Sequence, residues 1–406
     1  MTHYQITVNE ELLHQLFVGT DRDAGIARLL ETVLNQVLRA QATEQLEAEA
    51  YERTEARKGH RNGSYERDLV TRAGSITLRV PRFRDGTFST ALFARYQRSE
   101  QALVLSLMEM VVNGVSTRKV SRITEELCGT EFSKSTVSEL CKQLDPQVQE
   151  WNNRPLHESA YPFVAIDALY IKVREEGRVR SRGVLVGYGV SEAGRREILG
   201  LQLADTESES SWGAYFRWLK ERGLHGVELV TSDQHSGLVR AVRQHFQGAS
   251  WQRCQTHFMK NIRDAAPKPL QAEVVSRVRS IFDAPDMEQA RECLLRTLAA
   301  CQEKAPRAME ILEQGVEDAL AVLLFPEPYR VRLRTTNGME RLNREIRRRE
   351  NVIQIFPNSA SAIRLLGAML LEENEKWIRH RFYMDMSEYH AWRKRNSATP
   401  TDTTVE

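Results

Sequence analysis

The segment from 160 to 265 constrains the fold most, because strand-like apolar runs give way there to a regular alternation of helices and strands. Three runs come first, YPFVAIDALYIKV, RSRGVLVGYGV and REILGLQLA, with glycine turns between them. An amphipathic helix, the apolar strand GVELVTSD, a second helix and the short strand ASWQRC follow. Strands joined by turns, then strands joined through helices, predict one mixed sheet in an α/β domain.

This order of elements matches a ribonuclease-H-like sheet. Beyond it, from 262 to 328, apolar residues recur at helical spacing, with breaks at proline residues. We therefore predict that this stretch is entirely helical. The polar residues from 391 to 406 are expected to form a disordered tail.

The N-terminal residues 1–57 are predicted to be largely helical. Ile26, Leu30, Val33 and Val37 recur at intervals that place them on one face of a helix. Such a face packs either against another subunit or in a domain core, and the sequence leaves both alternatives open.

Residues 58–110 are expected to form a small basic module with β-structure. The run SITLRV alternates like a strand, and the pairs Asn62-Gly63 and Asp85-Gly86 are turn signals. The arginines that we expect to contact DNA in this module are Arg79, Arg82 and Arg84.

Residues 111–150 have the pattern of a helix–turn–helix. A first helix over STRKVSRITEEL is followed by a turn with glycine, and Ser133 is a suitable N-cap for a second helix. In this motif the start of the second helix meets base edges in the major groove of DNA. The exposed candidates for that contact are Lys134, Ser135, Thr136 and Ser138. The alternative is an ordinary helix pair without DNA.

Composition sets wider limits. The formal net charge of +2 does not by itself imply nucleic acid, but basic residues are concentrated in a few segments, which favours local phosphate contacts. The five cysteines are scattered, so a disulfide framework is not expected. No apolar run reaches the length of a membrane span and no signal peptide is evident, which predicts a cytoplasmic protein without a membrane partner.

Three carboxylates stand out as candidate metal ligands. Asp167 lies inside an apolar strand, where an unpaired charge is costly unless it is paired or binds a metal; the alternative is an ion pair with Lys172. Asp233 ends a second apolar strand, and its alternative role is to cap the following helix. Glu340 opens an arginine-rich helix, and its alternative role is a capping box with Asn337.

Taken together, the three carboxylates predict a site for divalent cations. At about 4 Å separation each pair would repel by roughly 4 kcal/mol at an effective dielectric constant of 20. Two Mg²⁺ or Mn²⁺ ions relieve that repulsion and assist an in-line attack on phosphate. Spacing alone does not identify such a triad, since acidic residues are common.

Several longer motifs resemble the Mutator-like bacterial insertion-sequence transposases, which use a DDE triad. They are IDALYIKVR, TSDQHSGL, WQRCQTHFMKN and RLRTTNGMERLNREIRRRENVIQIFPN, in the order of that family. The resemblance covers about 30–390. It implies that Asp167, Asp233 and Glu340 are the catalytic, metal-binding residues.

The resemblance also implies a ribonuclease-H-like core in two parts, 151–261 and 336–390, interrupted by an all-helical insertion at 262–335. The expected substrate is DNA: the terminal inverted repeats of the element and a target. Because two ends must be joined, a homodimer or larger assembly on DNA is expected. The pair Cys254 and His257 also matches a signature of that family. Its spacing would suit half of a zinc site, but a structural or active-site supporting role is favoured.

Asn337 is expected to support the same site, and the arginines around Glu340 are expected to contact DNA phosphates. Those candidates are Arg334, Arg344, Arg347 and Arg348. The alternative for them is a surface helix held by salt bridges. For the whole chain, the alternatives are a nuclease on the same fold without strand transfer, and a DNA-binding regulator with an inactive core.

Overall fold

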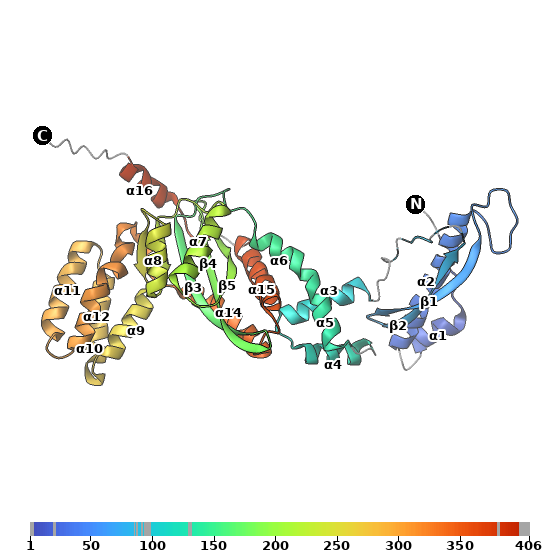
Figure 1. Ribbon diagram of the computed structural model, residues 1–406, viewed down its shortest axis with the longest axis horizontal. Coiled ribbons are helices and arrows are strands. Elements are labelled where there is room, and N and C mark those ends of the chain that lie inside the picture. Colours follow the sequence, from blue (N-terminus) through green and yellow to red (C-terminus); the bar gives the residue numbers. More distant parts are fainter. Residues whose placement is uncertain are drawn as a thin grey trace. The chain divides into compact units, whose positions relative to one another are not determined.

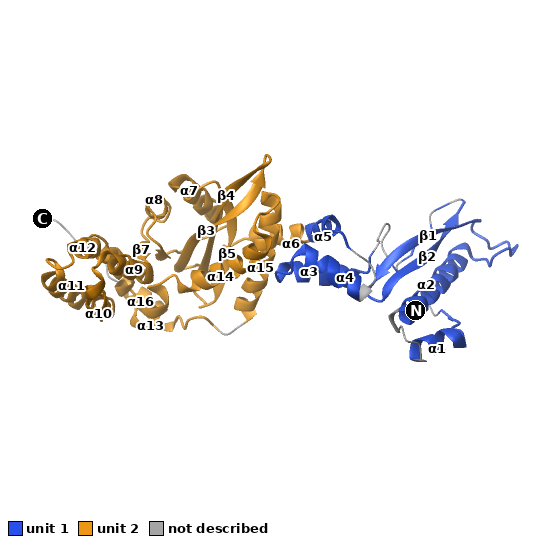
Figure 2. Ribbon diagram, turned by 90° about the horizontal axis from the view of Figure 1, so that it is seen from below, with its two compact units in different colours: residues 1–143 blue, residues 144–406 orange. Residues whose placement is uncertain are grey.

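The protein is described from a computed structural model. The structure describes residues 4–18, 22–84, 86, 88–90, 92, 99–128, 132–379 and 382–397. The chain divides into two compact units, 1–143 and 144–406 (Figure 2). Each unit is considered by itself.

The first unit contains a two-stranded antiparallel sheet covered by a helix. Strands β1 (Arg61–Thr71) and β2 (Gly74–Phe83) form the sheet, and α2 (Arg22–Leu46) packs on it, with α1 (Glu10–Val18) alongside (Figure 1). The buried residues of this core are Leu38, Leu69, Ile76, Leu78 and Val80. Helix α2 therefore packs in a domain core, through Ala27, Leu30, Leu34 and Leu38; of the predicted face, Leu30 belongs to this core and Ile26 is exposed.

One predicted turn is wrong. Asn62 and Gly63 lie inside β1, where the pairing register shifts between Arg61 and Ser64 and Gly63 has a φ of 73°. They form a β-bulge. A bulge favours glycine, as a turn does, so the residue pair was mistaken for a turn. The actual turn joins Thr71 to Gly74. Asp85, in the second predicted turn, lies outside the described residues.

Three helices complete the first unit. They are α3 (Gln101–Val112), α4 (Thr117–Cys128) and α5 (Lys134–Cys141). Helices α4 and α5 pack together, and the hydroxyl of Ser133 accepts a 3.1 Å hydrogen bond from the amide of Thr136. The predicted helix pair and its N-cap are thus confirmed.

The second unit is built on a five-stranded mixed sheet in the order β5-β4-β3-β6-β7. The strands are β3 (Phe163–Glu175), β4 (Arg178–Val190), β5 (Arg196–Ala204), β6 (Leu229–Ser232) and β7 (Ser250–Arg253). Strand β4 is antiparallel to both β3 and β5, whereas β6 runs parallel to β3 and β7 runs parallel to β6. The predicted mixed α/β sheet is confirmed.

Helices cover both faces of this sheet. On one face, α7 (Glu209–Glu221) and α8 (Ser236–His245) pack on the side chains of Val164 and Ile166. On the other lie α14 (Asn337–Ile353) and α15 (Ser359–Arg379), with α6 (Asp145–Asn152) against α15. Because successive strand residues face opposite sides, Asp167 points to the α14 face.

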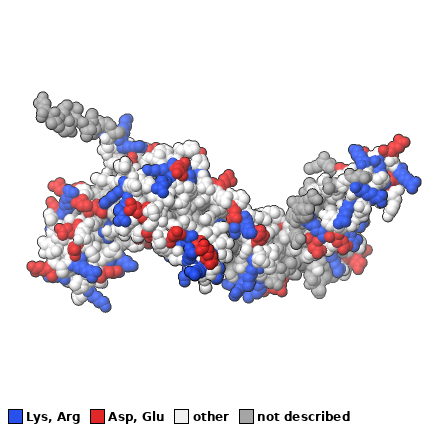
Figure 3. Space-filling model, viewed as in Figure 1, with Lys and Arg blue, Asp and Glu red and all other residues white. Residues whose placement is uncertain are grey.

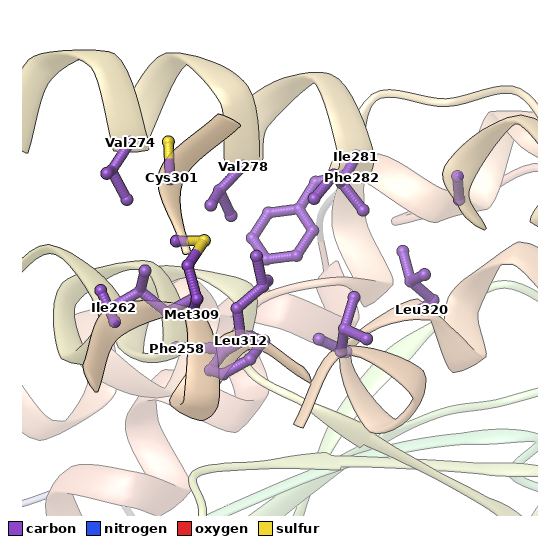
Figure 4. Packing of buried hydrophobic residues seen from close by; sticks show 14 of the residues in the cluster. Phe258, Ile262, Val274, Val278, Ile281, Phe282, Cys301, Met309, Leu312 and Leu320 are labelled. Carbon is purple, nitrogen blue, oxygen red and sulfur yellow. The ribbon is translucent and has the colours of Figure 1, made fainter. Parts of the chain in front are cut away.

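The stretch predicted to be helical is helical throughout. It contains α9 (Gln255–Ala265), α10 (Gln271–Phe282), α11 (Met287–Cys301), α12 (Pro306–Leu320) and α13 (Glu327–Leu333), with short 3₁₀ turns at Lys268–Leu270 and Ala321–Leu324. A further 3₁₀ turn, at Lys142–Leu144, lies elsewhere in the chain, directly before α6. Helices α9 to α12 share a core of their own in which Phe258, Val278, Met309 and Leu312 meet (Figure 4). This part of the chain therefore has a hydrophobic core of its own, in addition to that of the sheet.

The prediction that disorder begins at 391 is wrong for the residues up to Ser397. Helix α16 (Ser387–Ser397) is held because Tyr389 is wholly buried and the ring of Trp392 packs 5.2 Å from that of Phe325. Residues 398–406 lie outside the described residues. Of the helices within the described ranges, none is both long and apolar enough to cross a bilayer.

Candidate active site

Two acidic side chains from separate elements flank one imidazole, and a third lies nearby. Asp167 lies in β3, Asp233 directly follows β6, and Glu340 is in the first turn of α14. The Nδ1 atom of His257, on α9, contacts an Asp233 carboxylate oxygen, and its Nε2 lies 3.6 Å from Oε1 of Glu340. Asp233 is also close enough to Asp167 to raise its pKa.

Asp167 is half-buried and held on both of its oxygens. Oδ1 accepts a 2.8 Å hydrogen bond from the amide of Ala168, and Oδ2 accepts a 2.6 Å bond from the side-chain amide of Asn343. Burial, followed by the charge of Asp233, raises the pKa of Asp167 to about 7. The alternative partner, Lys172, lies five positions along β3 and faces the other side of the sheet.

The capping alternative for Asp233 is wrong. Helix α8 begins at Ser236 after the N-cap His235, and no side chain caps its amides. The Oδ1 atom of Asp233 instead contacts Nδ1 of His257. The side chain of Asp233 therefore belongs to the cluster around His257 and not to the start of α8.

The capping box that was the alternative role for Glu340 is also not formed. Helix α14 begins at Asn337, so Thr336 stands at the position before the helix, and its hydroxyl donates to the sulfur of Cys254 at 3.2 Å. Asn337 is exposed in the first turn of the helix. The carboxylate of Glu340 is therefore left for other interactions.

Cys254 joins the two segments that carry His257 and Glu340. Its buried sulfur accepts hydrogen bonds from the amide and the hydroxyl of Thr336, and its own amide donates to the carbonyl of Ser232. Burial disfavours the thiolate, but the hydrogen bonds from His257 and Thr336 outweigh that effect and lower the pKa of Cys254. Hydrogen bonding to Asp233, then to Cys254, raises the pKa of His257 to about 10.

The site has groups that suit a divalent cation. Ligand atoms of Asp233, Cys254 and His257 lie within 4.8 Å of one another. The Cys254 sulfur already accepts two hydrogen bonds, so a metal–thiolate bond would displace them. The carboxylates of Asp167, Asp233 and Glu340 are hard oxygen donors of the kind that Mg²⁺ and Mn²⁺ take. The residues fit such ions better than zinc.

Sequence reasoning missed two residues of the site. Asn343 lies three positions after Glu340, on the same helix face, and that spacing was a signal for its contact with Asp167. Glu207, in the segment before α7, is largely buried, accepts from the indole of Trp212 at 3.4 Å and contributes to the raised pKa of Asp167. No local pattern in the sequence pointed to Glu207.

The arginines expected to contact DNA differ in their surroundings. Arg334 is paired with Asp283, Arg347 with Glu350 and Arg348 with Glu345, as in the salt-bridged alternative. Arg344 is exposed and makes no ion pair with any residue that the structure describes. Such surface pairs contribute little, so phosphate can still replace them.

The candidates in the first unit are exposed. Lys134, Ser135, Thr136 and Ser138 all lie on the surface of α5. Of the arginines in the β-module, Arg79 is paired with Glu66, Arg82 lies over the ring of Tyr65 and Arg84 is exposed. Their contact with DNA remains a prediction.

The fold and site together define an α/β protein with a polar centre of carboxylates gathered from distant parts of the chain. Residues 1–380 match the family described as "Transposase, Mutator family". The chain belongs to the Mutator family of transposases.

Relatives of nearly the same length agree. The chain is 47% identical over 380 residues to the transposase for insertion sequence element IS256 in transposon Tn4001 of Staphylococcus aureus, covering 93% of this chain and 97% of the relative. It is 43% identical over 370 residues to the transposase for ISRM5 of Rhizobium meliloti (91% and 93%). It is 41% identical over 387 residues to the transposase for IS1081 of Mycobacterium tuberculosis (95% and 93%).

Proposed function

We propose that this protein is the DDE transposase of an insertion sequence, with Asp167, Asp233 and Glu340 as the catalytic, metal-binding residues. The observation that carries the proposal is that Asp233, after β6, and Glu340, on α14, flank His257, while Asp233 is also close enough to Asp167 on β3 to raise its pKa. A sheet of three antiparallel strands followed by two parallel strands supports a ribonuclease-H-like core. Residues 262–335 then form its all-helical insertion.

The three carboxylates would hold two Mg²⁺ or Mn²⁺ ions. Bound there, the ions would supply Lewis-acid stabilisation of phosphate charge and lower the pKa of an attacking water. Asn343 holds the Asp167 carboxylate in a fixed orientation through its 2.6 Å hydrogen bond. Cys254 and Thr336 tie the start of α14 to α9 and so keep Glu340 beside His257. Positioning and charge stabilisation are the contribution of the chain itself.

The reaction has two balanced steps. In the first, the oxygen of water bonds to the scissile phosphorus, the bond to the 3′-oxygen of the element end breaks, and a free 3′-hydroxyl and a 5′-phosphate result. In the second, that 3′-hydroxyl attacks a phosphodiester of another DNA segment, and the 3′-oxygen of that segment leaves. The first step consumes one water and breaks one phosphodiester bond, and the second breaks one phosphodiester bond and forms another. Neither step passes through a covalent protein–DNA intermediate.

The substrate follows from the relatives, whose names describe transposases for insertion sequence elements. We infer that this chain binds the terminal inverted repeats of its own element, with contacts from the helix pair α4–α5 and the basic β-module, and then a target DNA. Two ends must be held together, so the active form is a homodimer or larger assembly.

The decisive experiment is incubation of the protein with labelled element ends and Mg²⁺, followed by mapping of the cut strands and of joined products. The expected result is a nick at the element boundary and joining of pre-cut ends to a second duplex. Asp233→Asn should bind ends normally and cut none. Cutting without joining would identify a nuclease, and binding without cutting by the wild-type protein would identify a regulator.

A further inference from the structure

A cavity of about 620 Å³ opens beside Glu340, within the second unit. Its walls come from α9, α10 and the segment that joins α13 to α14, and its lining includes both His257 and Glu340. It is therefore continuous with the candidate active site. Ligand sites in proteins have volumes of about 300–1,000 Å³, so the space admits a group the size of a nucleotide.

One wall carries a row of basic side chains that begins at the site. On α9, His257, Lys260 and Arg263 follow at intervals of three residues, so they share one helix face, each about 4.5 Å further along the axis. Lys260 is exposed and makes no ion pair with a residue in the described ranges. The partner of Arg263 is the exposed Asp264, and such a pair contributes little.

The facing wall adds further positive charge. Arg279 on α10 is exposed, and no ion pair to it is found in the part of the chain that the structure describes. Arg334 is paired at 2.8 Å with Asp283, which neutralises that acid. Away from Glu340, the cavity is thus positive on balance. On the face of the second unit seen in Figure 3, lysine and arginine are interspersed with acidic residues.

The cavity is not lined by charge alone. Met259, Val275 and Phe282 contribute apolar surface between the basic walls. Phe282 belongs to the core shared by α9 to α12, with its ring 6.1 Å from that of Phe258 (Figure 4), so this surface is firmly supported. Cations beside apolar and aromatic surface suit nucleic acid, since phosphates meet the cations while sugars and bases meet the apolar part.

We propose that this cavity holds the DNA strand next to the scissile phosphate, with backbone phosphates bound by Lys260 and Arg279 and by Arg263 as a third contact. The helical insertion is then part of the substrate-binding surface, which positions the strand for the carboxylates. This inference rests on the proposed function and adds to it the residues that hold the strand.

The test compares two charge-reversal variants on labelled element ends. Lys260→Glu/Arg279→Glu changes the cavity, whereas Lys304→Glu/Arg307→Glu changes two exposed cations of the same insertion that do not line it. Single-turnover cleavage in Mg²⁺ should fall on the order of tenfold or more in the cavity variant and stay near wild type in the control. Thermal unfolding should be unchanged in both, because all four side chains are exposed.

A neutral variant, Lys260→Gln/Arg279→Gln, provides a second measurement. The slope of log binding constant against log salt concentration should become shallower by about 0.7–0.9 for each lost phosphate contact. If wild type cuts, Asp233→Asn does not, and the cavity variants cut and bind like wild type, this inference is overturned while the proposed function stands. If wild type fails to cut ends, the proposed function itself fails.

Discussion

The side-chain amide of Asn343, on α14, donates a 2.6 Å hydrogen bond to Oδ2 of Asp167 on β3. It links the first candidate ligand to the helix that carries the last one, Glu340. A carboxylate held in this way keeps one orientation, whereas a free one rotates between several. The relationship predicts that Asn343 acts through Asp167.

We expect Asn343→Leu to reduce Mg²⁺-dependent cleavage by about 10–100-fold while end binding is retained, as for other residues that orient metal ligands. The reason is loss of the bond to Asp167, so more Mg²⁺ should be needed for half-maximal rate. Gln302→Leu, at an exposed amide, is the control. An unchanged Mg²⁺ dependence in Asn343→Leu would refute this role.

The raised pKa of Asp167 predicts how the metal-free protein responds to pH. Because the pKa is about 7 in the folded state, above its ordinary value, the ionised carboxylate destabilises the fold. Stability in a chelator should fall as pH rises from about 4 to about 7, by at most about 1.4 kcal/mol per pH unit from this group. Asp167→Asn should remove that part of the pH dependence, measured by denaturant unfolding at several pH values. Equal pH profiles for both proteins would contradict the prediction.

Cys254 is predicted to stabilise the fold. Cys254→Ala leaves the amide and hydroxyl of Thr336 buried without their acceptor, which costs about 1–3 kcal/mol of unfolding free energy. Chemical denaturation should show this loss, and Cys293→Ala, at a partly exposed cysteine, should show less. Stoichiometric zinc in the purified wild-type protein, lost in Cys254→Ala, would point instead to a metal role.

Gly338 is predicted to be required for the position of Glu340. A β-carbon at 338 would lie 2.6 Å from the hydroxyl oxygen of Tyr188 and 3.0 Å from its ring, so Gly338→Ala forces the first turn of α14 or the buried ring of Tyr188 to shift. A displacement near 1 Å can cost about 10²-fold in rate, and cleavage should fall accordingly, with end binding retained. Adding Tyr188→Phe should restore part of the activity, since it removes the closest atom. Full activity of Gly338→Ala alone would exclude this constraint.

The sequence predicted the elements better than the contacts between them. The apolar run through Asp167 and the one that ends before Asp233 indicated strands, because burial on both faces leaves a continuous pattern. The turn at Asn62 was misplaced because a bulge and a turn favour the same residues. Helix α16 was missed because Tyr389 and Trp392 are fixed by rings more than sixty positions earlier, which no local pattern records.

For the candidate site too, the sequence predicted the residues better than the contacts between them. The three carboxylates were predicted from strand positions and from a family resemblance, but their mutual approach depends on side chains that only the fold brings together. Asn343 had a helical-spacing signal, whereas Glu207 had none. The partners of Arg347 and Arg348 are nearby glutamates on the same helix, so helical spacing alone would have found them.

The helical insertion leaves and rejoins the chain at almost one point, since the amide of Gln255 donates to the carbonyl of Arg334. A segment whose two ends meet can be lengthened, shortened or exchanged at small entropic cost to the remainder. The helical insertion can therefore differ among related transposases while their sheets remain similar. This junction lies between the helical insertion and Glu340. Each such exchange would therefore also change how DNA bound by the insertion is positioned relative to the candidate active site.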